Sequence, residues 1–158
     1  MKTRRYRAAG GIVLDSSLRV LLIERHVVRD NREIHEVRLP KGHIDPGETD
    51  AEAAVRETCE ETGYCQLDVI ADLGESVSEY DFENVHYHRN EHYYLMRLRS
   101  AERRPIHAAP GSEEALFSPL WAESLQSATS MLTYETERDF ALRAAEWLRK
   151  SAQQAQQQ

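Results

Sequence analysis

The chain has 158 residues, of which 41% are hydrophobic, and its formal net charge is −7. This length and apolar content suit one folded domain with its own core and exclude a largely disordered chain. The acidic balance argues against a protein whose main partner is a nucleic-acid backbone, because such binding needs a basic surface. The sequence shows no apolar run long enough to span a bilayer and no secretory segment after Met1, so we expect no membrane partner.

The first part of the chain predicts a hairpin. Residues 2–14 begin with basic side chains and continue into an apolar run, which is typical of a strand that enters a core. A turn over residues 15–17 leads to a second strand over residues 20–25, which pairs back on the first. We expect a polar loop over residues 27–36 before the chain reaches its main motif.

That motif is residues 42–64, GHIDPGETDAEAAVRETCEETGY. Thr49 and Glu52 are three residues apart, as in a capping box, so a helix should begin near Asp50. Gly63 stands where a glycine commonly ends a helix. The motif therefore predicts a loop, a helix and a second loop.

Three carboxylates share one face of this helix, because Glu57, Glu60 and Glu61 are spaced i, i+3 and i+4. Crowded carboxylates repel each other, and hard divalent cations such as Mg²⁺ or Mn²⁺ prefer oxygen ligands. A solvated acidic helix face is the plain alternative, and the charge pattern alone does not choose between the two. Arg56 is at helical spacing from Glu52 and Glu60 and can pair with either.

The chain contains two cysteines, Cys59 in the helix and Cys65 just after it, which is too few for a disulfide framework. Cys59 falls on the predicted core side and is interpreted as a small buried hydrophobe. A reduced, cytoplasmic setting is the simplest inference from this cysteine content.

After the helix, residues 65–73 and 76–82 predict two strands. Residues 83–90 are expected to form a turn region, and residues 91–99 predict a further strand. A loop with two prolines follows over residues 100–112.

Histidines and tyrosines gather around this turn region. His86, His88 and His92 share strand parity and would face one way. A zinc site is one interpretation, although no carboxylate or cysteine spacing supports it. A polar sheet face near the substrate is the alternative, and Tyr87 and His92 are candidates for substrate contacts there. A tyrosine in a strand is, however, more often a packing residue.

The last third of the chain predicts a short strand over residues 113–120, a short helix beginning within residues 121–128, and an amphipathic helix over residues 134–150. The buried stripe of this last helix is predicted to be Phe140, Ala144, Trp147 and Leu148. Residues 151–158 form a polar, low-complexity tail that we expect to be disordered, which leaves residues 1–150 as one domain.

The fixed positions of the motif resemble the 23-residue signature of the Nudix hydrolases. The matching positions are Gly42, Glu48, Arg56, Glu57, Glu60, Glu61, Gly63 and Tyr64. The chain departs from the family at Thr58, where an aliphatic residue is usual. This resemblance implies a metal-dependent pyrophosphohydrolase of the α+β class, an α/β/α sandwich in which a mixed sheet lies between helices.

The resemblance also implies a ligand set. Mg²⁺, with Mn²⁺ as the alternative, would be held by Glu57, Glu60 and Glu61. An acidic residue in the region of the predicted strand over residues 113–120 often reaches the metal in this family, and Glu114 is the candidate here, with Glu113 as the alternative. The backbone carbonyl of Lys41 would complete the shell.

Other motif residues have implied roles beside the metal. Arg56 would orient the carboxylates and belongs with the catalytic set. Glu48 would fix the loop against the helix without touching metal, and Gly42 and Gly63 are structural positions of the motif. The candidates for the general base are Glu57, Glu113 and Glu114.

The segment Leu39-Pro40-Lys41-Gly42-His43 resembles the diadenosine tetraphosphate hydrolases, and related segments occur in the diphosphoinositol polyphosphate and oxidised-nucleotide branches. Lys41 would offer a point charge to a bridging phosphate. His43 is a substrate candidate, with a structural loop histidine as the alternative. Diadenosine tetraphosphate hydrolases usually carry a lysine near Glu91 and His92 that is absent here.

We therefore expect a nucleotide pyrophosphohydrolase that converts a dinucleoside polyphosphate such as diadenosine tetraphosphate to ATP and AMP. An oxidised nucleoside triphosphate of the 8-oxo-dGTP type is the rival substrate. A non-catalytic nucleotide-sensing module is the alternative of another class, and an RNA cap-removing enzyme is disfavoured by the acidic charge. A small-molecule nucleotide is the expected partner of a monomer or homodimer.

Overall fold

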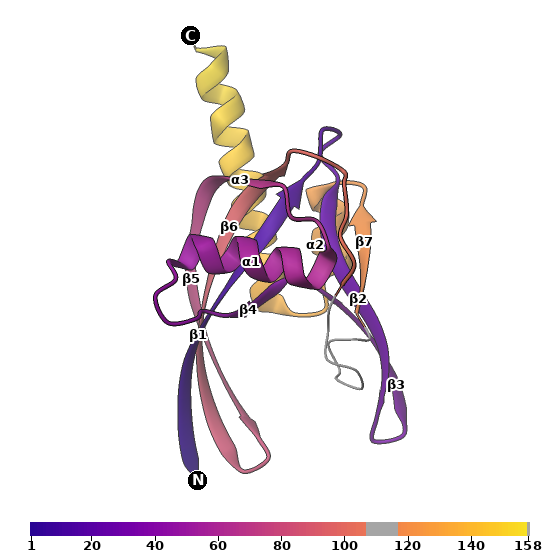
Figure 1. Cartoon of the computed structure of the whole chain (residues 1–158), viewed down its shortest axis with the longest axis vertical. Coiled ribbons are helices and arrows are strands. Elements are labelled where there is room, and N and C mark those ends of the chain that lie inside the picture. The colour runs from indigo at the N-terminus through magenta and orange to yellow at the C-terminus, as the bar shows by residue number, and fades with distance from the viewer. Residues whose placement is uncertain (107–116, 158) are drawn as a thin grey trace.

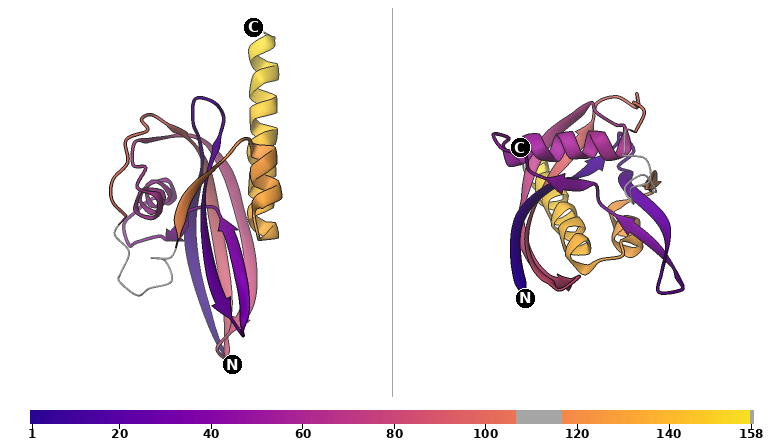
Figure 2. Two further views of the ribbon diagram at one scale, coloured as in Figure 1. Left: turned by 90° about the vertical axis from the view of Figure 1, so that its right-hand side faces the viewer. Right: turned by 60° about the horizontal axis from the view of Figure 1, so that its bottom comes forward.

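The computed structural model describes residues 1–106 and 117–157. Within them, a mixed seven-stranded sheet lies between helix α1 on one face and helices α2 and α3 on the other, as Figures 1 and 2 show. The strands are β1 (Lys2–Leu14), β2 (Val20–Arg29), β3 (Arg32–Arg38), β4 (Lys41–His43), β5 (Leu67–Phe82), β6 (Val85–Leu98) and β7 (Ser118–Ala122). The helices are α1 (Asp50–Thr62), α2 (Leu125–Met131) and α3 (Glu135–Gln156). The predicted α+β fold, with a mixed sheet between helices, is confirmed.

Strand β1 is the central strand of the sheet, whose order is β3-β2-β1-β6-β5. β1 and β6 run parallel, whereas the other pairs are antiparallel. The short strand β4 pairs with the middle of β1 through Ala8–His43, Ala9–Gly42 and Gly10–Lys41. This pairing holds the start of the motif at the centre of the molecule, directly before α1.

The apolar part of β1 is buried on both faces of the sheet. Ile12 packs in the cluster that contains Phe140 of α3, whereas its neighbour Val13 packs in the cluster that contains Ala53 and Ala54 of α1. Successive side chains of a strand point to opposite faces, so a strand covered on both sides reads as a continuous apolar run. In the predicted stripe of α3, Phe140 and Ala144 are buried, and Trp147 and Leu148 pack partly buried against the same cluster.

Helix α1 begins and ends as its sequence predicts. The Thr49 side chain accepts a hydrogen bond from the Glu52 N–H at 3.1 Å, and the Glu52 carboxylate accepts one from the Thr49 N–H at 3.2 Å. Gly63 is in the left-handed region with φ of 80°, and its N–H donates to the Cys59 carbonyl at 2.8 Å. Only glycine adopts this conformation without steric cost, so the helix ends here.

The prediction of a polar loop over residues 27–36 is wrong. These residues form a hairpin in which β2 and β3 pair as far as Arg29 and Arg32, with Asp30 and Asn31 at its tip. Both tip residues have positive φ, 50° and 61°, as two-residue hairpin turns require. The hairpin extends away from the core (Figure 1), so its strands lack the apolar alternation by which a strand is usually predicted.

The turn region expected over residues 83–90 is also too long. The pairing of β5 and β6 runs from Leu67–Leu98 to Phe82–Val85, and only Glu83 and Asn84, with φ of 48° and 61°, form the turn. The two strands predicted over residues 65–73 and 76–82 are one strand with register shifts near Ile70 and Leu73.

The C-terminal elements differ from prediction at their ends. Trp121 lies in β7, and α2 begins only at Leu125. Residues 113–116 of the predicted strand lie outside the described residues. α3 continues to Gln156, so residues 151–156 are helical and not a disordered tail, because alanine and glutamine favour helix even without packing. None of the described helices is long and apolar enough to cross a membrane.

Cys59 and Cys65 form a disulfide, which corrects the interpretation of Cys59 as a free buried thiol. The left-handed turn at Gly63 brings Cys65 back toward the third turn of α1. Spacing alone did not reveal the pairing, because two cysteines six residues apart can approach only if the helix ends between them. Free thiols are therefore no longer an argument for a reduced, cytoplasmic setting.

Candidate active site

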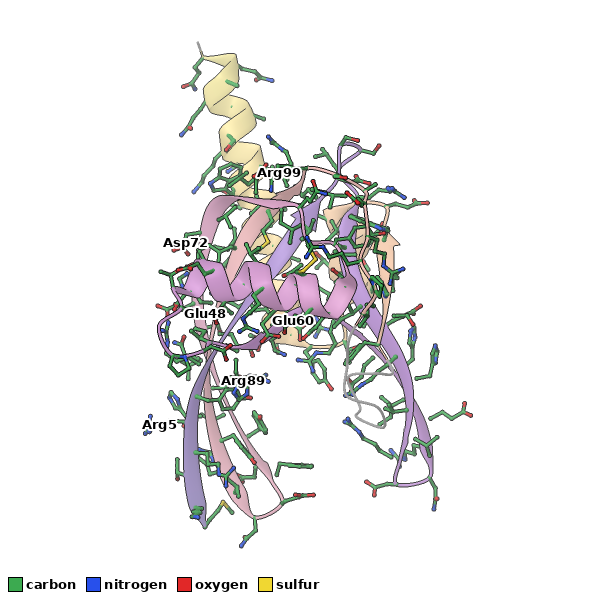
Figure 3. The ribbon with its side chains drawn as sticks, viewed as in Figure 1. Arg5, Glu48, Glu60, Asp72, Arg89 and Arg99 are labelled. Carbon is green, nitrogen blue, oxygen red and sulfur yellow. A yellow bond between two sulfur atoms is a disulfide. The ribbon has the colours of Figure 1, made fainter. Side chains whose placement is uncertain are left out.

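The start of the motif and one side of α1 border a cavity of about 460 Å³. The charged side chains that line it are Arg25, Arg38, Lys41, Glu57, Glu61 and Arg89. Figure 3 shows Glu48 and Glu60 along one edge of α1, with Arg89 below them on β6. Carboxylates of α1 and cationic side chains of β2, β3, β4 and β6 therefore face a common space.

Arg56 joins the loop before α1 to the carboxylates of the helix. Its Nε and Nη2 donate to the Glu48 carboxylate at 2.7 and 2.9 Å, and Nη2 also donates to the His43 carbonyl at 2.9 Å. Its Nη1 donates to Glu57 at 2.8 Å and to Glu60 at 3.2 Å. These contacts, above all the hydrogen bonds that Arg56 donates to Glu48, raise the pKa of Arg56 further. One guanidinium thus fixes the loop against the helix and orients two of the three carboxylates.

Glu57 and Glu61 lie in an environment that disfavours negative charge. Burial raises the pKa of Glu61 to about 8, with Lys41 opposing the shift and Glu57 adding to it. Burial also raises the pKa of Glu57, although Arg56 opposes that shift. The backbone N–H of Lys41 donates to the Glu61 carboxylate at 3.4 Å. The pKa of the Lys41 side chain is lowered, mainly by burial and then by the charge of Arg38.

The chemistry of this donor set fits a hard divalent cation. Its side-chain ligand atoms are all carboxylate oxygens, from Glu57, Glu60 and Glu61. Burial disfavours the ionised form of a carboxylate, and a bound cation would favour it. The carboxylates are not gathered around one point, however. The described residues contain two groups of three His, Asp or Glu with ligand atoms within 4.8 Å of one another, and neither includes Glu57, Glu60 or Glu61. Arg56 instead holds Glu57 and Glu60.

Two of the cavity arginines are backed by buried glutamates. Arg25 donates to Glu36 at 3.0 and 3.2 Å, and Arg38 donates to Glu137 of α3 at 2.9 Å. Glu137 also accepts the Leu39 N–H at 2.6 Å. Although burial opposes it, the charge of Glu137 raises the pKa of Arg38, so this guanidinium stays charged. A buried partner also holds a long side chain in one orientation.

Arg89 follows the same pattern on β6. Its Nε lies 2.5 Å from Oε1 of Glu91, which is 1% exposed, but the alignment is that of an ion pair and not of a hydrogen bond. Arg25, Arg38 and Arg89 are not among the site residues predicted from the sequence. The sequence does contain a signal for Arg89. Glu91 lies in a strand with apolar residues after it, and a buried carboxylate needs a cation on its own face of the sheet. Arg89, two residues away, lies on that face.

Two of the predicted substrate residues meet around Tyr6. His43 is exposed and stacks on Tyr6, with ring centroids 4.5 Å apart and an interplanar angle of 13°. Tyr87 packs edge-on against Tyr6 at 6.3 Å and stacks on Tyr80 at 5.1 Å. These rings border a second cavity of about 500 Å³, which shares Tyr6 and His43 with the first.

The remaining predicted residues are elsewhere. His92 lines neither of the two cavities. Its Nδ1 lies 2.8 Å from Asp50, and its Nε2 lies 2.7 Å from Asp72. His86 bonds to Asp81 on its own hairpin, and no metal-type group within the described ranges joins His86, His88 and His92. Glu113 and Glu114 lie outside the described residues.

A sequence model of the NUDIX domain matches residues 4–140 of the chain. The chain is 31% identical over 108 residues to an RNA pyrophosphohydrolase of Erythrobacter litoralis, which covers 62% of this chain and 65% of that protein. It is 54% identical over 50 residues to the asymmetrical bis(5'-nucleosyl)-tetraphosphatase of Mus musculus, which covers 30% of this chain and 34% of that protein. The aligned segments span less than two thirds of either relative.

A similar solved structure is the C. elegans Ap4A hydrolase in a binary complex. It matches with a TM-score of 0.65 and 21% sequence identity, and the match covers 92% of this chain and 98% of that one. This likeness shows the fold. The two sequence relatives are named for different substrates, so the family is established by these matches and the substrate is not.

Proposed function

Because the chain belongs to the NUDIX family and is a Nudix hydrolase, we propose that it cleaves a phosphoanhydride bond in a dinucleoside polyphosphate, with diadenosine tetraphosphate giving ATP and AMP. The observation that supports this substrate is one cavity that joins the carboxylates of α1 to a set of cationic side chains. Tyr6 and His43 connect that cavity to a second, aromatic one.

In this proposal the metal is Mg²⁺, with Mn²⁺ as the alternative. The residues that would hold it are Glu57, Glu60, Glu61, Glu114 and the Lys41 carbonyl. When bound, such an ion would polarise the phosphate oxygens and lower the pKa of a coordinated water. Arg56 would keep Glu57 and Glu60 in the orientation that ligation needs, because it already contacts both.

The cationic side chains would hold the phosphates. Arg38 and Arg89 each line the cavity and each has a buried acid behind it, so they would meet a phosphate with little loss of side-chain entropy. Lys41 would add a point charge beside them. A tetraphosphate has enough anionic groups to engage these cations and the metal at once, whereas a short pyrophosphate does not.

The aromatic side chains would hold a nucleoside. A base that stacks on Tyr6, His43 or Tyr87 would lie next to the cationic cavity, and each stacked base contributes about 1–3 kcal/mol. A dinucleotide presents two bases, one at each end of its phosphate chain. The second cavity therefore supports a substrate that continues beyond the cleaved bond.

Two alternatives make different use of the same residues. An oxidised nucleoside triphosphate would fill the first cavity alone and leave the aromatic one unused. A non-catalytic nucleotide-sensing module would bind a ligand without turnover, but such a module has no need of three metal-type carboxylates in one helix. The first alternative predicts another substrate, and the second predicts no product.

The test is a substrate panel in ¹⁸O-labelled water with products identified by mass spectrometry. We expect ATP and AMP from diadenosine tetraphosphate, with the label in one of them. Two ADP molecules would rule out the asymmetrical cut. Fast hydrolysis of 8-oxo-dGTP without turnover of the dinucleotide would favour the oxidised-nucleotide rival, and binding without any hydrolysis would favour the sensing module.

A further inference from the structure

A group of metal-ligand side chains lies on the β2–β3 hairpin, outside both cavities. His26 and His35 are directly opposite each other in the strand pairing, and their rings stack with centroids 4.3 Å apart and an interplanar angle of 3°. Nε2 of His35 lies 2.8 Å from Oε2 of Glu24. Ligand atoms of Glu24, His26 and His35 all lie within 4.8 Å of one another.

The three side chains share one face of the hairpin because of strand geometry. Glu24 and His26 are two residues apart on β2, and His35 is the cross-strand neighbour of His26. Arg25, between them, points to the other face and lines the active-site cavity. His26 and His35 are exposed and Glu24 is partly exposed, so a dissolved ion could reach this face without entering the cavity.

Two imidazoles and one carboxylate are the donors of a first-row transition cation. Imidazole nitrogen suits Zn²⁺, Ni²⁺ and Cu²⁺, whereas Mg²⁺ prefers oxygen donors throughout. We propose that Glu24, His26 and His35 form a binding site for one divalent cation of the Zn²⁺ class, distinct from the Mg²⁺ site assigned to α1. Three protein ligands leave further positions to water, which suits an exposed site.

The second group of ligand-type side chains in the described residues, Asp50, Glu75 and His92, has a different character. Arg7 already pairs with Asp50 at 2.5 Å and with Glu75 at 2.9 Å. Both ring nitrogens of His92 already face carboxylates. That group is an ion-pair network, in which a metal would have to displace arginine. On the hairpin, by contrast, the partner of Glu24 is His35, itself a member of the proposed site.

The test uses the full chain and Zn²⁺ as the probe. Isothermal titration calorimetry would be run at neutral pH with excess Mg²⁺, which occupies oxygen-ligand sites. We expect one Zn²⁺ per chain. His26→Ala and His35→Ala should each weaken binding at least about tenfold, since even residues that only support a ligand cost that much when changed. His88→Ala, which changes a histidine of the other hairpin, should bind Zn²⁺ as the unaltered chain does.

A second readout locates the ion directly. In nuclear magnetic resonance spectra the ring signals of His26 and His35 should shift together on addition of one equivalent of Zn²⁺, while those of His88 should not. Circular dichroism would confirm that the variants are folded, as expected for exposed hairpin positions. The proposal would be overturned if the chain bound no Zn²⁺ in excess Mg²⁺. It would also be overturned if the double variant His26→Ala/His35→Ala bound Zn²⁺ as tightly as the unaltered chain.

Discussion

Gly42 lies against the carboxylate of Glu57, so closely that a Cβ on Gly42 would overlap the carboxyl carbon and both oxygens. The glycine of β4 thus sets the position of a side chain on α1. No dihedral requirement is involved, because Gly42 does not have positive φ, and the restriction is purely one of space. This contact gives a physical reason for glycine at the first position of the motif.

Gly42→Ala should therefore displace Glu57 while leaving the fold in place. We expect kcat to fall about a hundredfold, the loss that a displacement of about 1 Å can cause in an active site. Steady-state kinetics would measure it. Gly47→Ala is the control, because a Cβ there meets nothing within 4 Å, although φ of 85° strains the backbone. If both variants lose activity equally, general destabilisation and not Glu57 is responsible.

Metal removal tests the proposed ligand set as a whole. Burial raises the pKa of both Glu57 and Glu61, so the ionised forms need a nearby cation. EDTA should abolish turnover, and added Mg²⁺ or Mn²⁺ should restore it. Full activity in metal-free buffer would contradict the proposal that hydrolysis depends on a metal.

A substitution of Glu60 tests one proposed ligand of that set. Its side chain is 56% exposed and lies 3.2 Å from Arg56, so its charge contributes little to the fold. Glu60→Gln keeps the shape and removes the charge. We expect at least a hundredfold loss of kcat, on the order of other losses of transition-state charge stabilisation. Glu123→Gln, another exposed glutamate, is the control. A native circular dichroism spectrum with less than a tenfold loss would show that Glu60 is not a ligand.

The motif helix could be predicted residue by residue because its signals are local. The capping box of Thr49 and Glu52 and the glycine at Gly63 act within one or two helical turns, and the structure has both. The two hairpins could not be predicted to their full length. The outer half of the β2–β3 hairpin, which pairs as far as Arg29 and Arg32, lies beyond the core, where no buried face imposes an apolar alternation.

Arg38 was not predicted as a site residue for a related reason. Arg38 lines the site because Glu137, almost a hundred residues later in sequence, packs behind it from α3. Such a partnership depends on tertiary packing and leaves no local pattern. His92 is the opposite case, a residue that was predicted to contact substrate but does not line either cavity. Its side chain instead hydrogen-bonds to Asp50 and Asp72. Strand parity alone does not say which neighbours a face will meet.

His92 connects the start of α1 to the sheet and should make stability depend on pH. Although burial opposes it, the hydrogen bonds to Asp50 and Asp72 raise the pKa of His92. A raised folded-state pKa gives stability that is complete below the unfolded value of about 6.5 and is lost as pH rises through the folded value. The hydrogen bond from Arg7, and to a smaller extent the one from His92, lowers the pKa of Asp50. The stability that the ionised Asp50 carboxylate contributes is therefore lost only in strong acid.

The measurement is thermal unfolding of the unaltered chain and of His92→Gln across the pH range. The difference in Tm should be largest between about pH 4 and 6.5 and should shrink as pH rises further. Comparison with the variant cancels other titrating groups, and His88→Gln serves as the control on β6. An equal difference at about pH 5.5 and about pH 9 would mean that His92 is not charged in the folded state.

Lys41 tests how far the phosphate chain reaches. Its side chain lines the cavity with Arg38 and Arg89, and burial, with the charge of Arg38, lowers its pKa. A polyphosphate that contacts Lys41 would favour the charged form, because a nearby anion opposes both causes of that shift. If Lys41 meets phosphates beyond the cleaved bond, only a long substrate gains from its charge.

Lys41→Ala should then raise KM for diadenosine tetraphosphate about ten- to hundredfold, the equivalent of one charge-assisted hydrogen bond, and should raise KM for ADP-ribose much less. Lys41→Met keeps the aliphatic stem and separates lost charge from a cavity left by truncation, so it should behave like Lys41→Ala. Lys150→Ala, at an exposed lysine of α3, should leave both KM values unchanged. Equal increases for the two substrates would place Lys41 at phosphates that both share, and the proposal that it holds the far end of a tetraphosphate would fail.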